Sequence, residues 1–257
     1  MQAQVTAAQQ ESASRKRLVT AAILPVIAVI ILWCVHFIDL VFELDLNRNG
    51  ISPRTIPGLK GILFMPFLHS SEEFSSHLIN NSTSLLFLGW AVMYFYPRLA
   101  GKVVLFTWFL GGVLVWITAR PSFHIGASGI IYGLAGFLFT SGVLRKQRTL
   151  MALSMLIVFL HGSMVWGVLP VMPNLSWEGH LWGMFSGILV AVLFRHVPPA
   201  VSDPRPIHFD EDEEDEKLDE IAPGPPEMEG KQILPPASPG PWHTSDSWSN
   251  GADGKSS

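Results

Sequence analysis

Two residues that can do nucleophilic chemistry together lie in segments of this sequence apolar enough to cross a membrane. Ser128 stands in a Gly-Ala-Ser-Gly stretch at 126–129, with Tyr132 one helical turn later, and His180 lies in a later apolar segment. A serine hydroxyl becomes a nucleophile when a histidine removes its proton. Because polar side chains are costly in hydrocarbon, their presence there indicates chemistry rather than packing.

The composition indicates a membrane protein with several spans. The chain has 257 residues, 49% of them hydrophobic, and a mean hydropathy of +0.34. A spanning helix needs about 20 apolar residues, and the sequence predicts six, of which the third and last are short: 18–38, 77–96, 103–119, 127–144, 150–170 and 179–194. We therefore expect an all-α polytopic membrane protein. The single cysteine, Cys34, excludes an intramolecular disulfide and a cysteine-based zinc site.

Basic residues predict how these helices are oriented. They gather in alternate loops, at 15–17, 98–102, 145–148 and 195, and such loops tend to stay in the cytoplasm. Both termini are therefore expected to be cytoplasmic. We interpret the first span as a retained helix, because no signal-peptide cleavage pattern follows it. The lack of an Arg-rich, Ser-rich transit sequence favours a bacterial-type plasma membrane.

Polar extensions flank the predicted membrane domain. We expect a polar cytoplasmic N-terminus at 1–17, disordered over 1–14, a six-helix domain at 18–196, and an acidic, Pro-rich, disordered cytoplasmic tail at 197–257. After Val197 the chain has 14 acidic and 4 basic residues, and too few apolar ones to form a core. The alternative for the tail is a docking segment for a basic partner.

A layer of polar residues is predicted near the outer face. His77 and Asn81 lie near the start of the second span, Ser128 near the start of the fourth and His180 near the start of the sixth. With a rise of about 1.5 Å per residue, Asn81, Ser128 and His180 fall within about 3 Å of one another in depth. Packing alone explains such a layer poorly.

Small residues predict contact between the fourth and sixth spans. At helical spacing, one face of the fourth span holds Ser128, Gly129, Tyr132, Gly133 and Gly136. One face of the sixth span holds His180, Gly183 and Gly187. Small residues let membrane helices approach closely, which would bring the serine and the histidine within hydrogen-bonding distance. The alternative is two ordinary glycine packing motifs with an incidental serine.

Three motifs, in this order on alternate spans, resemble those of the rhomboid family of intramembrane serine proteases. His77 and Asn81 match the family's H-x-x-x-N helix. Its G-x-S-G motif, with a tyrosine four residues after the serine, is matched by Gly126, Ser128, Gly129 and Tyr132. Its H-x-x-G-x-x-x-G helix is matched by His180, Gly183 and Gly187. The resemblance covers residues 18–196 and implies a six-transmembrane-helix rhomboid-like bundle.

The resemblance also implies a role for each motif residue. Ser128 would be the nucleophile and His180 its base, with Tyr132 packed on the histidine in place of a third triad member. The family pattern assigns stabilisation of the oxyanion to the Ser128 N–H and the side chains of His77 and Asn81. The supporting glycines would be Gly126, Gly129, Gly183 and Gly187.

Two loops are expected to control access to this site. The apolar segment 61–68 is too short to span, so we expect it to dip into the outer leaflet. The family's Trp-Arg pair is not evident in this loop, although Arg54 is present. The segment 170–177 resembles the family's cap over the active site, and the alternative is a plain connector.

Other histidines compete for these roles. His124 is interpreted as an interfacial residue that could line the site, and His161 as a structural histidine or a second choice for a proton relay. A metal site formed by His77, His124 and His180 is the alternative, although few carboxylates are available to support it.

Three functions follow from the sequence. The first is hydrolysis of transmembrane segments of other membrane proteins within the lipid bilayer, without cofactor, metal or nucleic-acid partner. The second is a catalytically inactive relative that binds membrane clients. The third is a histidine-lined transporter or metal-binding protein, which would not need Ser128.

Overall fold

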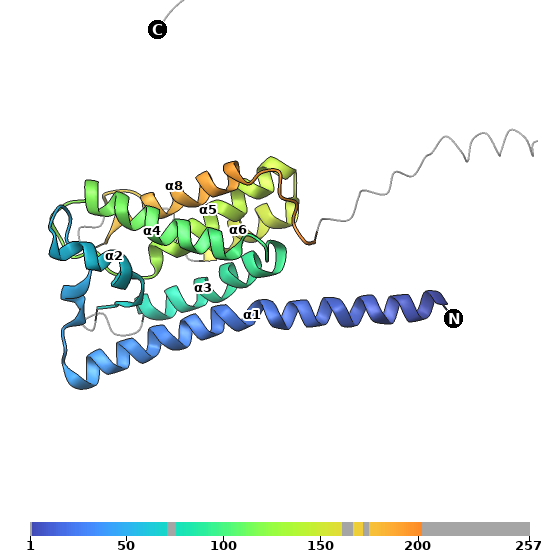
Figure 1. The fold of residues 1–257 in the computed structure, drawn as a ribbon, viewed down its shortest axis with the longest axis horizontal. Coiled ribbons are helices and arrows are strands. Elements are labelled where there is room, and N and C mark those ends of the chain that lie inside the picture. Colours follow the sequence, from blue (N-terminus) through green and yellow to red (C-terminus); the bar gives the residue numbers. More distant parts are fainter. Residues whose placement is uncertain (1, 71–75, 161–166, 172–174, 202–257) are drawn as a thin grey trace, which may run out of the picture. The chain divides into compact units, whose positions relative to one another are not determined.

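The computed structural model describes residues 2–70, 76–160, 167–171 and 175–201 (Figure 1). Within these ranges the α-helices are α1 (Gln2–Phe42), α2 (Gly61–Phe64), α3 (Ser76–Phe95), α4 (Ala100–Thr118), α5 (Ser128–Arg145), α6 (Arg148–Leu160) and α8 (Trp177–Leu193). Short 3₁₀ helices are η1 (Leu46–Asn49), η2 (Pro57–Lys60) and η3 (Met65–Phe67). The predicted all-α class is confirmed for this part of the chain.

Three described helices are long and apolar enough to cross a membrane. They are the Ser12–Phe42 part of α1, together with α4 and α5. The other predicted spans are shorter or more polar: α8 has 17 residues, the described α6 has 13, and α3 has 20 but carries adjacent asparagines in its second turn. The described residues thus support a helical membrane protein without giving the predicted count of six.

Two predicted boundaries differ from the structure. Disorder over 1–14 was the wrong prediction for Gln2–Ser14, which is helical. This segment is rich in Ala and Gln, which favour helix, and extending an existing helix is far easier than nucleating one. The predicted span 150–170 is also too long, because 167–171 forms turns where Gly167 and Pro170 disfavour helix.

Some predictions fall on parts of the chain that the structure does not describe. His161 lies outside the described residues, as do 172–174 of the predicted cap and the tail from residue 202 onward. The start of the predicted tail is described. There, the Ala200 N–H donates a hydrogen bond of 2.7 Å to the Phe95 carbonyl at the end of α3.

Helix α5 is the buried centre of the helices. Most of its side chains are inaccessible, and it packs against α3, α4, α6 and α8 (Figure 1). Its apolar residues, among them Leu134, Phe137 and Leu138, join one core cluster with residues of α3 and α8. The first turn of α5, which carries Ser128, is therefore held from several sides.

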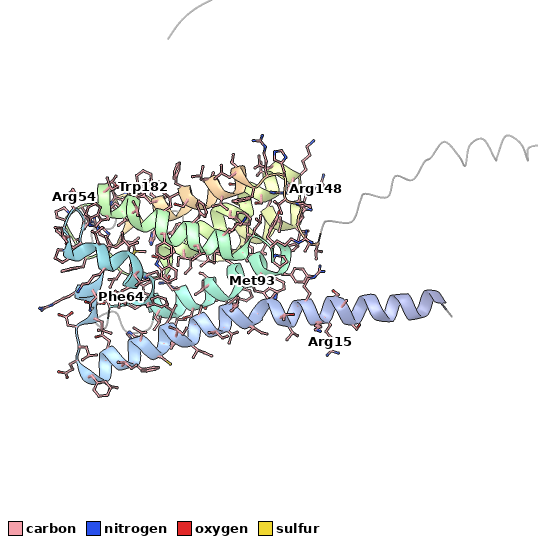
Figure 2. The ribbon with its side chains drawn as sticks, viewed as in Figure 1. Arg15, Arg54, Phe64, Met93, Arg148 and Trp182 are labelled. Atoms are coloured by element: carbon pink, nitrogen blue, oxygen red, sulfur yellow. The ribbon has the colours of Figure 1, made fainter. Side chains whose placement is uncertain are left out.

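The connection from α1 to α3 packs against α4. The Arg54 guanidinium donates to the Ala119 carbonyl at 2.7 Å, and the Trp108 indole N–H donates to the Ile62 carbonyl at 2.7 Å. Figure 2 shows Arg54 and Trp182 at one end of the helices and Arg148 at the other. The segment 61–68 forms α2 and η3, and the carbonyl of Met65 accepts a 2.9 Å hydrogen bond from the Gly126 N–H.

Candidate active site

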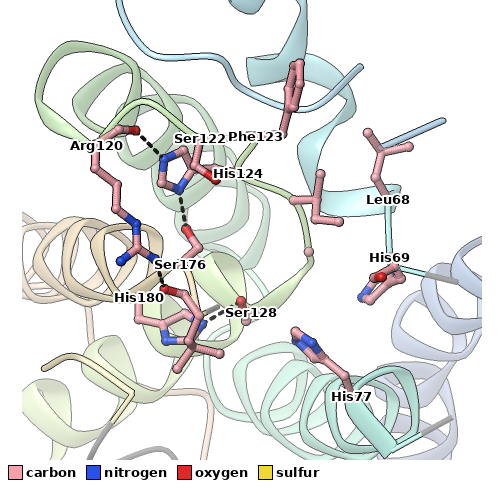
Figure 3. Close-up of a pocket in the computed structure, with 14 residues that line it drawn as sticks. Leu68, His69, His77, Arg120, Ser122, Phe123, His124, Ser128, Ser176 and His180 are labelled. Carbon is pink, nitrogen blue, oxygen red and sulfur yellow. Dashed lines mark hydrogen bonds between the residues drawn. The ribbon is translucent and has the colours of Figure 1, made fainter. Parts of the chain in front are cut away.

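The side chains of Ser128 and His180 form a hydrogen bond between α5 and α8 (Figure 3). Nε2 of His180 lies 2.8 Å from Oγ of Ser128. Both residues are buried, with exposed fractions of 7% for Ser128 and 4% for His180. The contact expected from the glycine faces is therefore present, and the pair has the geometry of a nucleophile and its base.

The other ring nitrogen of His180 defines which tautomer the pair uses. Nδ1 lies 2.8 Å from the carbonyl oxygen of Gly167. A carbonyl only accepts hydrogen bonds, so Nδ1 carries the proton and Nε2 has the free lone pair that accepts from the Ser128 hydroxyl. A main-chain carbonyl thus orients the imidazole in the way that a carboxylate does in a Ser-His-Asp triad.

The ring of Tyr132 stacks on the imidazole. The ring centroids are 4.1 Å apart and the planes differ by 10°. Tyr132 lies one turn after Ser128, so one helix supplies both the hydroxyl and the ring that stacks on the imidazole. A β-carbon at Gly167 would overlap the Tyr132 hydroxyl, which explains why a glycine suits the position.

Glycine contacts bring α5 and α8 close enough for this pairing. A β-carbon at Gly183 would overlap the carbonyl oxygen of Gly129, and one at Gly187 would overlap that of Gly133. A β-carbon at Gly129 would lie 3.2 Å from the Gly179 carbonyl oxygen. The predicted glycine faces therefore pack backbone against backbone, as small residues permit.

The turn that leads into α5 places the Ser128 N–H at the start of the helix. Gly126 has φ +111°, a conformation that favours glycine. A β-carbon there would lie 3.6 Å from Ser128 Oγ and 4.0 Å from Asn81 Nδ2, in the space between the two side chains. Ser128 is the first residue of α5, so its N–H precedes the helical hydrogen-bond ladder, at the end of the helix dipole that favours negative charge.

His77 and Asn81 take different positions. His77 lines a cavity with Ser128, whereas Asn81 is buried and its Nδ2 lies 3.0 Å from Nε2 of His69. An amide nitrogen only donates, so neutral His69 accepts this hydrogen bond. The sequence motifs did not predict this role of His69. The one signal for it in the sequence is a histidine in the loop before α3. Burial, with a contribution from nearby His77, lowers the pKa of His69 to about 4.

A cavity of about 390 Å³ opens onto the serine (Figure 3). Its walls come from the loop before α3, the first turn of α3, the first turn of α5, the turn before it, and the start of α8. The lining side chains include His69, His77, His124, Ser128, Ser176 and His180. The cavity therefore gathers polar groups from segments far apart in the sequence around one hydroxyl.

Polar contacts tie the turn before α5 to the start of α8. Nδ1 of His124 lies 2.7 Å from Ser176 Oγ, and its main chain pairs with Ile51. The Arg120 N–H donates to the buried Glu178 carboxylate at 3.3 Å, and the Arg120 guanidinium lies 3.6 Å from that carboxylate. His124 is thus a buried wall residue, and burial lowers its pKa.

The alternative metal site has no support among the described residues. No group of three His, Cys, Asp or Glu side chains in this part of the chain is arranged to hold a metal ion. His180 instead contacts Ser128 and Gly167, and His124 contacts Ser176 and the Arg120 carbonyl.

Fold and site together define a helical membrane protein with a buried serine-histidine pair beneath a polar cavity. The chain belongs to the rhomboid family: the family model described as Rhomboid domain matches residues 58–197. The matched region contains every motif residue named above.

Relatives of this chain come from bacteria and a virus. An uncharacterised protein of Mycobacterium tuberculosis is 33% identical over 179 residues, which cover 64% of this chain and 71% of that protein. One of Mycobacterium leprae is 33% identical over 177 residues, which cover 63% and 67%. A protein of Acanthamoeba polyphaga mimivirus that carries the rhomboid name is 29% identical over 137 residues, which cover 51% and 73%.

Proposed function

We propose that this protein is an intramembrane serine endopeptidase that hydrolyses peptide bonds in or beside transmembrane segments of other membrane proteins. The observation that carries the proposal is the 2.8 Å hydrogen bond from Ser128 Oγ to His180 Nε2, with His180 Nδ1 bonded to the Gly167 carbonyl. Membership of the rhomboid family, whose members are generally serine proteases, supports the same reaction.

In the proposed acylation step, His180 removes the Ser128 proton as Oγ attacks the carbonyl carbon of the scissile bond. The imidazolium then donates that proton to the leaving nitrogen, and the C–N bond breaks to leave an ester on Ser128. Because the Gly167 carbonyl accepts from Nδ1 in both protonation states, the ring does not have to turn between the two transfers. Tyr132 restrains the ring plane throughout.

The negative oxygen of the tetrahedral intermediate needs donors beside Ser128 Oγ. We assign these to the Ser128 N–H, at the start of α5, and to the side chains of His77 and Asn81. The Asn81 amide has two N–H bonds, so it can donate one to His69 and keep the other for the oxyanion. Water from the polar cavity then attacks the ester, with His180 as base.

The proposed enzyme is a multi-pass protein of a cell membrane, in a six-helix bundle with both termini cytoplasmic. The basic clusters at 15–17, 98–102, 145–148 and 195 support this orientation, and the site would open toward the outer face. A bacterial-type plasma membrane is the proposed location, and the partners are transmembrane substrates in the lipid bilayer. The proposed reaction uses no metal or cofactor.

Cleavage of a transmembrane substrate by purified protein in detergent tests the proposal. Wild type is expected to cleave, whereas Ser128→Ala and His180→Ala lose activity by about a thousandfold or more. Ser141→Ala is the matched control, because Ser141 is a buried serine at the far end of α5. Cleavage that persists in Ser128→Ala would overturn the assignment.

A fluorophosphonate probe separates an active enzyme from an inactive client-binding relative. Labelling of Ser128 that disappears in His180→Ala is expected only if the pair is chemically competent. If folded wild type neither reacts with the probe nor cleaves, yet retains a transmembrane client, the inactive alternative is the correct one.

A further inference from the structure

An apolar cavity of about 420 Å³ lies on another side of α5 from the serine site. Its lining comes from α1, α3, α4, η3 and the first turns of α5, and includes Leu24, Gly101, Val104, Trp108 and Ala127. No charged side chain lines it among the described residues. With α1 and α4 as membrane spans, for which their length and composition suffice, this cavity would lie at the depth of hydrocarbon.

A second cavity, of about 330 Å³, lies at the end of α3 and is basic. Its lining includes the exposed Arg17 of α1 and Arg98 of the turn between α3 and α4, together with residues 197–200. The Arg17 guanidinium donates to the Ala200 carbonyl at 3.1 Å, which anchors it at this cavity. No acidic side chain lines the cavity among the described residues.

The two cavities follow each other along the same elements. Leu99 lines the basic cavity and Gly101 the apolar one, while on α1 the lining passes from Arg17 to Leu24. Seven residues of helix correspond to about 10 Å. That offset is comparable to the roughly 5 to 8 Å of headgroup region that covers the hydrocarbon of each leaflet.

We propose that these two cavities bind one anionic phospholipid. Its phosphate lies between Arg17 and Arg98, and one acyl chain occupies the apolar cavity as far as Trp108 and Ala127. The charge matches, since two arginines face the phosphate and no described carboxylate repels it. The size excludes a partner helix, because a helix about 10 Å wide occupies roughly 400 Å³ in a single turn, whereas an acyl chain is slender enough to enter.

The bound lipid would fill space directly beneath the serine site. Ala127 lines the apolar cavity and precedes Ser128, and Phe67 lines the same cavity two residues before His69. An acyl chain there would support the first turn of α5 and the loop that carries His69. The lipid site does not depend on the proposed protease activity.

Lipid affinity tests the headgroup half of the proposal. The full chain in detergent is titrated with phosphatidylglycerol or phosphatidylcholine and followed by native mass spectrometry. Wild type is expected to bind phosphatidylglycerol more tightly than phosphatidylcholine. In the double variant Arg17→Gln/Arg98→Gln, the ratio of the two affinities is expected to fall by about tenfold or more. Arg148→Gln/Arg195→Gln, which removes two other exposed arginines at the same end of the helices, should bind like wild type. Equal loss in both double variants would overturn a specific site.

Quenching by brominated acyl chains tests the apolar half. Bromine on the acyl chain of phosphatidylglycerol is expected to quench the fluorescence of Trp108. This quenching is measured as the difference in fluorescence loss between wild type and Trp108→Phe. Gly101→Leu should abolish that difference, because Gly101 lines the cavity and a side chain there has open space. Equal Trp108 quenching by brominated phosphatidylcholine, unaffected by Arg17→Gln/Arg98→Gln, would show ordinary surrounding lipid and overturn the proposal.

Discussion

His180 makes three contacts that together define its position: Oγ of Ser128, the Gly167 carbonyl and the ring of Tyr132. The two hydrogen bonds fix the tautomer and the direction of each ring nitrogen. The stacked tyrosine limits tilting of the ring plane. Each contact therefore controls a different aspect of how the imidazole is held.

Replacing Tyr132 should separate stacking from the effect of its hydroxyl. Tyr132→Phe keeps a ring 4.1 Å from the imidazole and is expected to retain kcat within about threefold. Tyr132→Ala frees the imidazole to tilt, and misalignment of this kind typically costs about a hundredfold. Peptidase kinetics below the melting temperature of each variant measure both. Equal loss in the two variants would show that the hydroxyl, not the ring, matters.

The buried His69 predicts that acid destabilises the folded protein. Its pKa is lowered from 6.5 to about 4 by burial first and then by nearby His77. As the pH falls from 6.5 toward 4 the unfolded chain takes up the proton first, so stability decreases across that interval by up to about 3 kcal/mol and then levels off. Thermal unfolding in detergent as a function of pH measures this.

His69→Gln provides the matched control for the pH effect. Glutamine keeps a hydrogen-bond acceptor for the Asn81 amide but does not titrate. Its stability is expected to depend less on pH between 6.5 and 4 than that of wild type. An unchanged pH dependence in this variant would assign the effect to another group, such as His124.

At the scale of elements, the α5–α8 contact sets the distance between the serine and the histidine. The two helices meet through glycines at 129, 133, 183 and 187, so their axes approach more closely than larger side chains would allow. The contacts of Arg120 and Ser176 then fix the loops at the ends of these helices. The geometry of the pair thus depends on glycines, which have no reactive groups.

Gly183→Ala is predicted to destabilise the protein and to reduce activity. Its methyl group would overlap the Gly129 carbonyl oxygen, and overpacking of this kind costs about 1 to 3 kcal/mol. Gly101→Ala is the control, since a β-carbon there meets nothing within 4 Å and alanine favours helix by up to about 1 kcal/mol. The changes in unfolding free energy of the two variants, measured in detergent, should therefore have opposite signs. A stable, fully active Gly183→Ala variant would contradict close helix packing.

At the scale of the whole molecule, the proposed six-span topology predicts that both termini face the cytoplasm. Epitope tags at the two ends of the chain should both be protected from protease added to intact cells and become accessible after permeabilisation. A tag inserted beside Ile56, which is 84% exposed in the loop between α1 and α3, should be cleaved in intact cells. Opposite protection of the two terminal tags would require an odd number of spans.

How far the sequence predicts this molecule depends on the kind of contact. The meeting of Ser128 and His180 was predictable, because glycine spacing on two helices is regular and helix geometry converts it into position. The bonds from His69 to Asn81 and from His124 to Ser176 were not, because they depend on loop conformations without a periodic pattern. The helix over Gln2–Ser14 differs from the predicted disorder, because the helix propensity of Ala and Gln outweighs the polarity on which that prediction rests.

The group that orients His180 belongs to the main chain, at Gly167. In an enzyme with a Ser-His-Asp triad, one nucleotide change can remove the carboxylate and leave the histidine misdirected. No codon change can delete a peptide carbonyl. Under the proposed function, a substitution at residue 167 acts through its new side chain, because a β-carbon there would overlap the Tyr132 hydroxyl and would lie 3.0 Å from His180 Nδ1. The property of residue 167 that matters for the orientation of the imidazole is therefore the size of its side chain.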